Sequence, residues 1–303
     1  MDESIEPDLA KATADALALP NSVDTHFHSL EMGRAGIDPA SILAWCFSHG
    51  LSAALDVSVT VADVADRLLL AESHPGLAVT AGYYPSEARR FASDAGHARS
   101  MMERLESALE NTRIVAVGEI GLDFLPRKPG VQAPNPPPSS EPGRDEDREY
   151  APRREQEELF RAQVEIAAAK GLPVVVHNRE ADREILEVLR LRRLSRGGIM
   201  HCYSSDAQTA FKFIDLGFLI SFAGNVTYRS SHVVQDAARR LPSKALLVET
   251  DAPYLTPVPL RGRKNSPAYI GYTYQFLAKL RGEPVEALVE QVRENFRRII
   301  SAA

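Results

Sequence analysis

The chain has 303 residues, of which 44% are hydrophobic and 25% charged, and it carries a formal net charge of −6 at pH 7. This length can bury the core of one large domain or two ordinary ones, and the acidic balance excludes general affinity for polyanions, so a polyanionic substrate would need a local basic site. Two cysteines without a CxxC pair exclude a disulfide framework and favour a reducing cytoplasm. The first twenty residues do not resemble a signal peptide, and no run of 18 apolar residues predicts a membrane span.

Short apolar runs rich in Val, Ile and Leu recur along the chain and predict strands that are buried on both faces. Helical stretches alternate with them, most clearly over 155–170, where Gly171 is expected to end the helix. Eight strands alternating with helices predict an α/β protein with a single closed (β/α)8 TIM barrel. An open doubly wound sheet is the alternative, but it usually has fewer strands and a glycine-rich phosphate turn, which is absent here. In chain order the predicted strands are 22–28, 51–59, 77–84, 114–118, 173–177, 198–202, 218–222 and 245–249.

One segment interrupts this alternation after the fourth predicted strand. Residues 126–153 hold 8 of the 20 prolines together with a run of charges. Such a composition cannot form a packed element and predicts a mobile insertion. Without it, and without residues 1–20 as an N-terminal extension, the chain has close to the roughly 250 residues of one barrel. We therefore expect one domain over 1–303.

The first predicted strand carries the sequence DTHFH, with His26 and His28 two residues apart behind Asp24. Side chains alternate along a strand, so all three point to one face. Two imidazoles on one face can bind a metal ion. The pair alone is equally well explained by two histidines that are satisfied by hydrogen bonds.

Polar side chains at the ends of other predicted strands favour the metal. Four of the eight histidines lie at carboxyl ends of strands, where barrel active sites are built, whereas the other four are expected at the surface. Glu119 and Asp251 follow strands four and eight, and a buried carboxylate is costly unless it is paired or metal-bound. The alternative interpretation is that these polar residues have a structural role as caps at the strand ends. The set can hold two divalent cations with open positions for water and substrate, and it comprises His26, His28, Glu119, His177, His201 and Asp251.

At these residues the chain resembles the TatD family of metal-dependent hydrolases, a branch of the amidohydrolase-like barrels. The matching motifs follow in order over nearly the whole chain: DTHFH, GEIGLD, PVVVHNREA, HCYS, ETDAPYLTP and RGRKNSP. The resemblance implies a TIM barrel, two divalent cations (Zn, Mg or Mn) and phosphodiester hydrolysis, usually as a deoxyribonuclease with 3'-5' exonuclease-like action. It also implies that the six residues named above are the metal ligands and that Glu119 bridges the two cations.

Three departures from the family pattern bear on substrate choice. The family commonly has His-Pro where this chain has Tyr84-Pro85, and Asn-Glu-Pro where it has Asn265-Ser266-Pro267. The third departure is the 126–153 insertion directly after GEIGLD.

We expect Asp251 and Glu119 to be catalytic, since Asp251 could accept the proton of a metal-activated water. Asp24, Asp123 and Glu249 are predicted to support the ligands from behind. Guanidinium groups pair well with phosphate, although the cluster at 261–264 is as well explained by a solvated loop. Base stacking by Tyr203 or Tyr228 is a weaker alternative to their packing in the protein. Substrate contacts are predicted for Arg179, Arg261, Arg263 and Asn265.

Two other functions remain open at this stage. The same barrel could hydrolyse a lactone, an amide, a phosphotriester or an aminoacyl nucleic acid, because fold and metal centre are shared by many chemistries. It could also be a non-catalytic metal-binding protein. Nucleic acid, most simply DNA, is the expected partner, no membrane is expected, and a monomer is slightly favoured.

Overall fold

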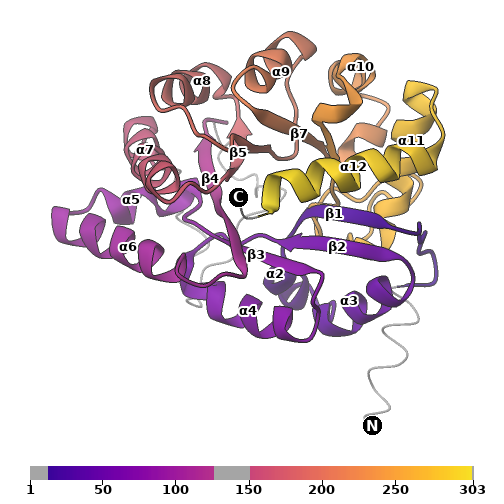
Figure 1. Ribbon diagram of the computed structural model, residues 1–303, viewed down its shortest axis with the longest axis horizontal. Helices are drawn as coiled ribbons and strands as arrows, with labels where there is room; N and C mark the ends of the chain where they lie inside the picture. The colour runs from indigo at the N-terminus through magenta and orange to yellow at the C-terminus, as the bar shows by residue number, and fades with distance from the viewer. Residues whose placement is uncertain (1–12, 126–150, 302–303) are drawn as a thin grey trace.

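Eight parallel strands, hydrogen-bonded to one another in chain order, form the centre of the molecule (Figure 1). The computed structural model describes residues 13–125 and 151–301. Helices follow the strands and surround them, so the predicted TIM barrel is confirmed. The strands are β1 Ser22–Phe27, β2 Leu51–Asp56, β3 Leu77–Ala81, β4 Ile114–Asp123, β5 Val174–Arg179, β6 Gly198–Met200, β7 Phe218–Phe222 and β8 Leu246–Val248.

Every strand except β1 is preceded by at least one described helix, and two further helices follow β8. The helix predicted over 155–170 is α7; it starts two residues earlier and ends at Gly171, which adopts the left-handed φ of +64°. No described helix is both long enough and apolar enough to span a membrane. The α-helices are α2 Ser29–Arg34, α3 Pro39–Ser48, α4 Val64–Glu72, α5 Ala88–Phe91, α6 Ala95–Ala108, α7 Arg153–Lys170, α8 Asp182–Leu191, α9 Ala207–Ile214, α10 His232–Arg240, α11 Ile270–Arg281 and α12 Val285–Ile300.

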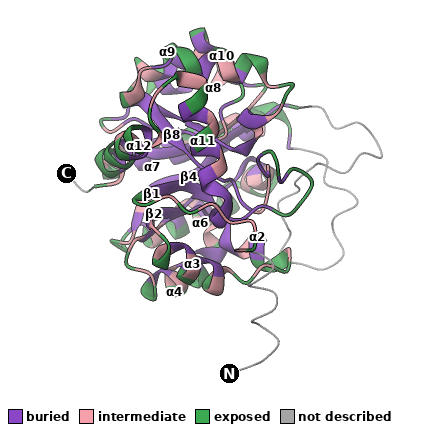
Figure 2. Cartoon of the chain, turned by 90° about the vertical axis from the view of Figure 1, so that its right-hand side faces the viewer, coloured by how far each residue is buried: buried purple, intermediate pink, exposed green. Residues whose placement is uncertain are grey.

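Most strand residues are buried (Figure 2). This is because helices cover the outside of the barrel and side chains fill its inside. All residues of β1, β6, β7 and β8 are buried, whereas the helices expose one side to solvent. On α7 the apolar side chains of Leu159, Phe160 and Val164 share the buried face. This pattern agrees with the strand and helix periodicities in the sequence.

The barrel closes between its first and last strands. A single bridge pairs Phe27 with Ala252, just beyond β8. The N–H of Asp251 donates to the carbonyl of His26 at 2.9 Å, and the N–H of His28 donates to the carbonyl of Ala252 at 2.9 Å. This seam therefore brings the DTHFH and ETDAP motifs side by side.

The fourth strand was predicted to end at Gly118, and this was wrong. β4 runs on to Asp123, with a register shift between Val117 and Ile120 that makes room for Glu119. Beyond the shift the strand pairs with β5 again, from Ile120 opposite Val176 onward. Glu119 thus lies within a strand, at an irregularity, and not after its end.

Most of the predicted insertion, residues 126–150, lies outside the described residues. Its last three residues belong to the packed structure, because Ala151 is buried and accepts a 2.8 Å hydrogen bond from Gln156 Nε2, and Arg153 begins α7. The predicted N-terminal extension is described from residue 13. There Leu17 donates to the carbonyl of Ala268 at 3.0 Å, so this end of the extension packs on the barrel.

Candidate metal centre

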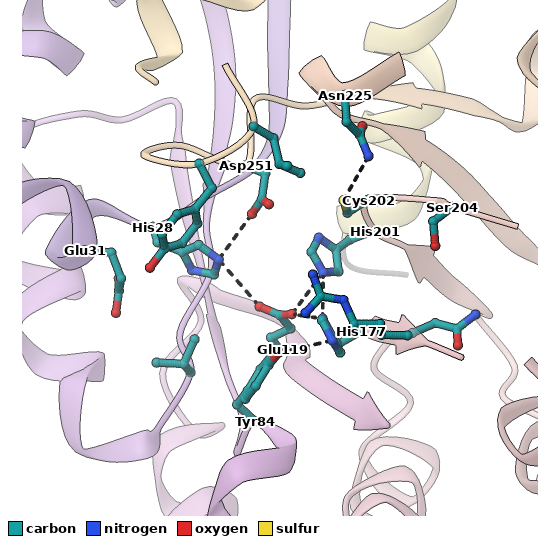
Figure 3. Close-up of a pocket in the computed structure, with 15 residues that line it drawn as sticks. His28, Glu31, Tyr84, Glu119, His177, His201, Cys202, Ser204, Asn225 and Asp251 are labelled. Atoms are coloured by element: carbon teal, nitrogen blue, oxygen red, sulfur yellow. Dashed lines mark hydrogen bonds and ion pairs between the residues drawn. The ribbon is translucent and has the colours of Figure 1, made fainter. Parts of the chain in front are cut away.

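A cavity of about 170 Å3 opens at the carboxyl ends of the strands (Figure 3). Its wall includes five of the six predicted ligands: His28, Glu119, His177, His201 and Asp251. His26 lies directly beneath them and is fully buried. The structure therefore brings together all six side chains that the sequence singled out, from β1 and the residue after it, from β4 and β5, and from the segments directly after β6 and β8.

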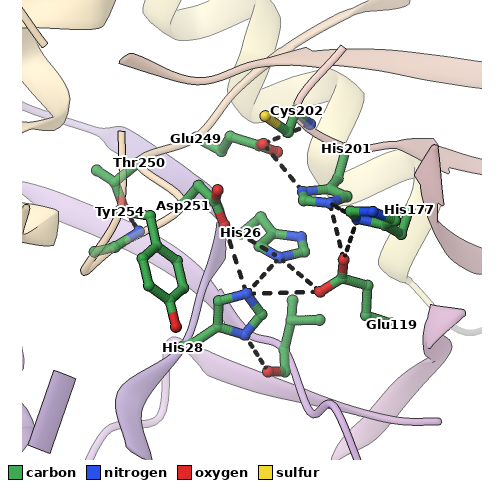
Figure 4. A network of polar contacts seen from close by, with 12 residues as sticks. His26, His28, Glu119, His177, His201, Cys202, Glu249, Thr250, Asp251 and Tyr254 are labelled. Carbon is green, nitrogen blue, oxygen red and sulfur yellow. Dashed lines mark hydrogen bonds and ion pairs between the residues drawn. The ribbon is translucent and has the colours of Figure 1, made fainter. Parts of the chain in front are cut away.

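Glu119 lies between two pairs of histidines, and each of its oxygens faces one pair (Figure 4). Oε2 is 3.5 Å from His26 Nε2 and 3.6 Å from His28 Nε2. Oε1 is 2.9 Å from both His177 Nδ1 and His201 Nε2. Asp251 completes the first group, with Oδ1 3.5 Å from His28 Nε2. One carboxylate is thus shared by two sets of nitrogen donors.

The second ring nitrogens of His28 and His201 face groups behind the site. His28 Nδ1 lies 2.8 Å from the carbonyl oxygen of Val57, so Nδ1 carries a proton and donates it. His201 Nδ1 lies 3.4 Å from Glu249 Oε1, which also accepts a 2.7 Å hydrogen bond from the N–H of Cys202. In both rings Nε2 is the nitrogen that faces the Glu119 carboxylate.

The electrostatics of the site favour positive charge next to ionised carboxylates. Burial alone would raise the pKa of Glu119, but His201, His177 and His26 together hold it well below its usual range. Burial would lower the pKa of His28, yet Asp251 and Glu119 raise it to about 9. Glu119 is therefore a carboxylate at neutral pH, which is the form that binds cations.

These residues fit divalent cations. Imidazole nitrogens and carboxylate oxygens are donors that Zn²⁺, Mn²⁺ and related ions accept. His26 Nε2 and His28 Nε2 lie only 3.2 Å apart and both face carboxylate oxygens. Three clusters of the described residues have ligand atoms close enough for one ion, and they comprise His26, His28 and Glu119; Glu119, His177 and His201; and His26, His201 and Glu249.

Asp24 of β1 is hydrogen-bonded to Thr250, the residue before Asp251. Its Oδ1 accepts from the N–H of Thr250 at 2.9 Å and its Oδ2 accepts from the Thr250 hydroxyl at 2.6 Å. Burial raises the pKa of Asp24 to about 7 in spite of these hydrogen bonds. Asp24 thus fixes the backbone on either side of the closing seam.

Of the predicted substrate contacts, Arg179 lines the cavity, with Nη1 3.6 Å from Asp123 Oδ2. The other three lie outside the cavity wall. Arg261 stacks over the ring of Tyr228 at 4.2 Å, and Arg263 pairs with Asp15. Both side chains therefore contact residues of other segments, and their predicted contacts with substrate stay predictions.

The predicted substrate contact of Asn265 is wrong. This side chain is fully buried, and its Nδ2 donates to the carbonyls of Thr250 at 2.8 Å and Tyr254 at 2.5 Å. Its amide therefore braces the loop after β8, because a buried amide must find partners within the protein. Tyr203, too, is buried in the core and does not reach the cavity.

Several residues of the cavity wall were not predicted from the sequence. Tyr254 lies in the ETDAPYLTP motif, but an aromatic residue after a strand carries no signal of its own. Asn225 follows β7, one of the strand ends for which the sequence suggested no residue. Glu31, on the helix after DTHFH, was also overlooked.

Glu31 belongs to a buried ionic network beneath the cavity. The fully buried Arg67 of α4 binds three carboxylates, with Nη2 2.9 Å from Glu31 Oε2 and 3.1 Å from Asp63 Oδ2, and Nη1 against Asp56. Asp56 also accepts from the N–H of Ser29 at 3.0 Å. Arg67 therefore connects the end of β2 to the start of α2, directly after His28.

A TIM barrel with imidazoles and carboxylates gathered around one buried carboxylate at its carboxyl end is the architecture of a metal-dependent hydrolase. The family model described as TatD related DNase matches residues 23–301. The chain belongs to this family, and the resemblance seen in its motifs is thereby confirmed.

Similar proteins agree with this assignment. The chain is 34% identical over 282 residues to the metal-dependent hydrolase TatD of Mycobacterium tuberculosis, covering 91% of this chain and 96% of that one. It is 31% identical over 291 residues to YcfH of Escherichia coli K12, also named a metal-dependent hydrolase, covering 91% and 94%.

Among solved structures, the TatD homologue YjjV of Escherichia coli K12 has a TM-score of 0.77 at 27% identity, covering 93% of this chain and 99% of that one. The organophosphorus hydrolase of Deinococcus radiodurans has a TM-score of 0.60 at 13% identity, covering 92% of each chain. At that identity the likeness shows a shared fold alone.

Proposed function

We propose that this chain hydrolyses phosphodiester bonds of nucleic acid, with DNA as its substrate, and that its cofactor is a pair of divalent cations. The proposal depends on one observation: each oxygen of Glu119 faces a different pair of imidazoles. Such an arrangement suits two cations, and paired cations suit phosphodiester cleavage. The family description, TatD related DNase, supports the same substrate class.

Six side chains would hold the cations. His26, His28 and Asp251 form one half of the site, His177 and His201 form the other, and Glu119 serves both. When bound, the cations would supply a nucleophile from water at neutral pH and offset the charge that grows on the phosphoryl oxygens.

In this proposal Asp251 accepts a proton. Burial would raise its pKa, but His28, His201 and His26 lower it, so the group is a carboxylate at neutral pH. It lies at the cavity wall and not beneath it, so a water and a leaving oxygen could reach it.

In this proposal Arg179 binds the phosphate of the substrate. Its guanidinium lines the cavity beside His177, and Asp123 lies within ion-pair distance at 3.6 Å and limits its orientation. A planar guanidinium can bind two phosphate oxygens at once and so orient the scissile group.

The test is hydrolysis by protein that is stripped with a chelator and reloaded with Zn²⁺, Mg²⁺ or Mn²⁺. Single-stranded DNA, RNA, bis(p-nitrophenyl) phosphate and a lactone serve as substrates. We expect metal-dependent cleavage of DNA, with turnover about 10²–10⁴-fold lower in Asp251→Asn because a proton acceptor is lost. His177→Ala should also lose activity, whereas His97→Ala, at an exposed histidine on α6, should match wild type.

Other outcomes separate the alternatives. Lactone hydrolysis without phosphodiester cleavage would assign a different reaction to the same centre. Absence of bound metal and of activity after reloading would favour a non-catalytic barrel. Wild-type turnover by both Asp251→Asn and His177→Ala would refute the proposed site.

A further inference from the structure

Tyr84 stands where the family commonly has a histidine, and in this chain it contacts a ligand of the proposed metal centre. Its Oη lies 3.1 Å from His177 Nε2, and the two rings meet edge to face with centroids 4.8 Å apart. Figure 3 shows the phenol beside His177 and Glu119 at the cavity wall. Only 9% of Tyr84 is exposed, so the contact is shielded from bulk water.

The geometry of His177 decides which of its nitrogens needs support. Nδ1 faces the centre, at 2.9 Å from Glu119 Oε1 and 3.3 Å from His201 Nε2. If Nδ1 is to bind a cation, the ring proton must reside on Nε2, and a group beyond Nε2 must accept it.

Among the residues that the structure describes, two side-chain oxygens lie near His177 Nε2. Tyr84 Oη is 3.1 Å away, within hydrogen-bond range, whereas Asp123 Oδ2 is 3.6 Å away, beyond it. With the proton on Nε2, the phenol oxygen is the nearer acceptor for it, and the Asp123 carboxylate is the nearest replacement. A phenol that accepts this proton retains its own O–H as a donor.

Tyr84 is itself held in place by the buried backbone around it. Its N–H donates to the carbonyl of Val59 at 2.9 Å. The preceding residue, Tyr83, is held at both its N–H and its carbonyl by the buried side chain of Gln163, at 2.7 and 2.9 Å. The phenol is thus presented by a fixed segment, as a positioning group requires.

We propose that Tyr84 is a positioning residue that holds His177 with Nδ1 turned toward Glu119 and thereby sets the cation affinity of the His177–His201 half of the site. The inference rests on the proposed function only in assuming that cations bind there. A phenol in place of an imidazole also supplies an acceptor that does not itself compete for the metal.

The test compares Tyr84→Phe with Tyr83→Phe, which removes a hydroxyl from the neighbouring tyrosine in the core. Full-length, metal-stripped protein is titrated with Zn²⁺ in competition with a chelator of known affinity. We expect Tyr84→Phe to weaken one of two binding events about 10-fold and to leave the other unchanged, because removing a partner behind a metal-bound histidine typically has this effect. Tyr83→Phe should bind as wild type does. Thermal unfolding verifies that both variants are folded.

Asp123→Asn gives a second test through the same nitrogen. Since Asp123 is the nearest replacement acceptor, the affinity lost in Tyr84→Phe/Asp123→Asn should exceed the sum of the two single losses. Additive losses, or wild-type affinity in Tyr84→Phe, would overturn the assignment of Tyr84. Because the readout is Zn²⁺ affinity, these results stand apart from the proposed function: a chain that binds two cations but cleaves no phosphodiester would refute the latter alone.

Discussion

Glu119 shows how one side chain can organise a whole site. Its two oxygens each contact a different pair of imidazoles, and burial keeps water from screening these contacts. The imidazoles in turn keep the carboxylate ionised. The ligands from β1 and those from β5 and β6 therefore depend on one residue of β4.

Replacement of Glu119 by Gln is expected to remove bound cations from both halves of the site, and not from one. The amide keeps the size of the side chain but has no charge to offset two divalent ions. Metal content after reloading and gel filtration checks this expectation. A variant that retains two equivalents of metal would show that Glu119 is not shared. Glu290→Gln, at an exposed ion pair on α12, is the control.

At the scale of elements, α4 supports the site through the buried Arg67. Replacing Arg67 with Ala leaves three carboxylates around a cavity without their counter-charge. Breaking a buried ion pair from one side typically costs about 3–5 kcal/mol of unfolding free energy. Denaturant unfolding measures the loss. Arg240→Ala, at an exposed ion pair on α10, is the control and should change the free energy of unfolding little. A loss no larger than that of the control would show that the network is not needed for stability.

The contact between β4 and β5 depends on Gly121. Its φ of +142° suits glycine, and a Cβ there would lie 2.0 Å from the carbonyl oxygen of His177. Gly121→Ala should therefore push β5 away at His177, which is a predicted metal ligand. Both the thermal midpoint of unfolding and the metal content should fall. Gly33→Ala, in α2 where a Cβ meets nothing within 4 Å, should lower neither. Equal behaviour of the two variants would contradict this reasoning.

At the scale of the molecule, buried tyrosines make stability sensitive to alkali. Burial raises the pKa of Tyr83 to about 12, and it also raises those of Tyr203, Tyr254 and Tyr274. The unfolded state releases these protons near pH 10, before the folded state does. The contribution of these protonated tyrosines to the free energy of unfolding is therefore complete below pH 10, and it is lost as pH rises from 10 to 12.

Urea unfolding between pH 8 and pH 11 tests this expectation. The midpoint of the wild-type protein should fall above pH 10, and that of Tyr83→Phe should fall less steeply because one ionisable group is gone. Parallel curves for the two proteins would mean that Tyr83 ionises equally in both states.

The sequence predicted the barrel and the gathering of the six polar residues because both depend on local patterns. Strand periodicity placed His26 and His28 on one face, and each of the other four follows or belongs to an apolar run. The sequence misplaced Asn265 and overlooked Arg67, because polar side chains are mostly exposed and no local pattern shows that these two are buried and paired within the protein. The irregularity in β4 at Glu119 also left no trace in the pattern, since an extra residue in a strand looks like the start of a loop.

The seam between β1 and β8 has a consequence for synthesis of the protein. The histidines of DTHFH leave the ribosome first among the predicted ligands, and Asp251 and the backbone partners of His26 and His28 emerge some 220 residues later. At about 5–20 residues per second, the two strands are separated by a delay of the order of ten to forty seconds. A cation held between them would therefore be captured with full affinity only after Asp251 has emerged, and a translation product interrupted before that residue would have neither the closed barrel nor the metal.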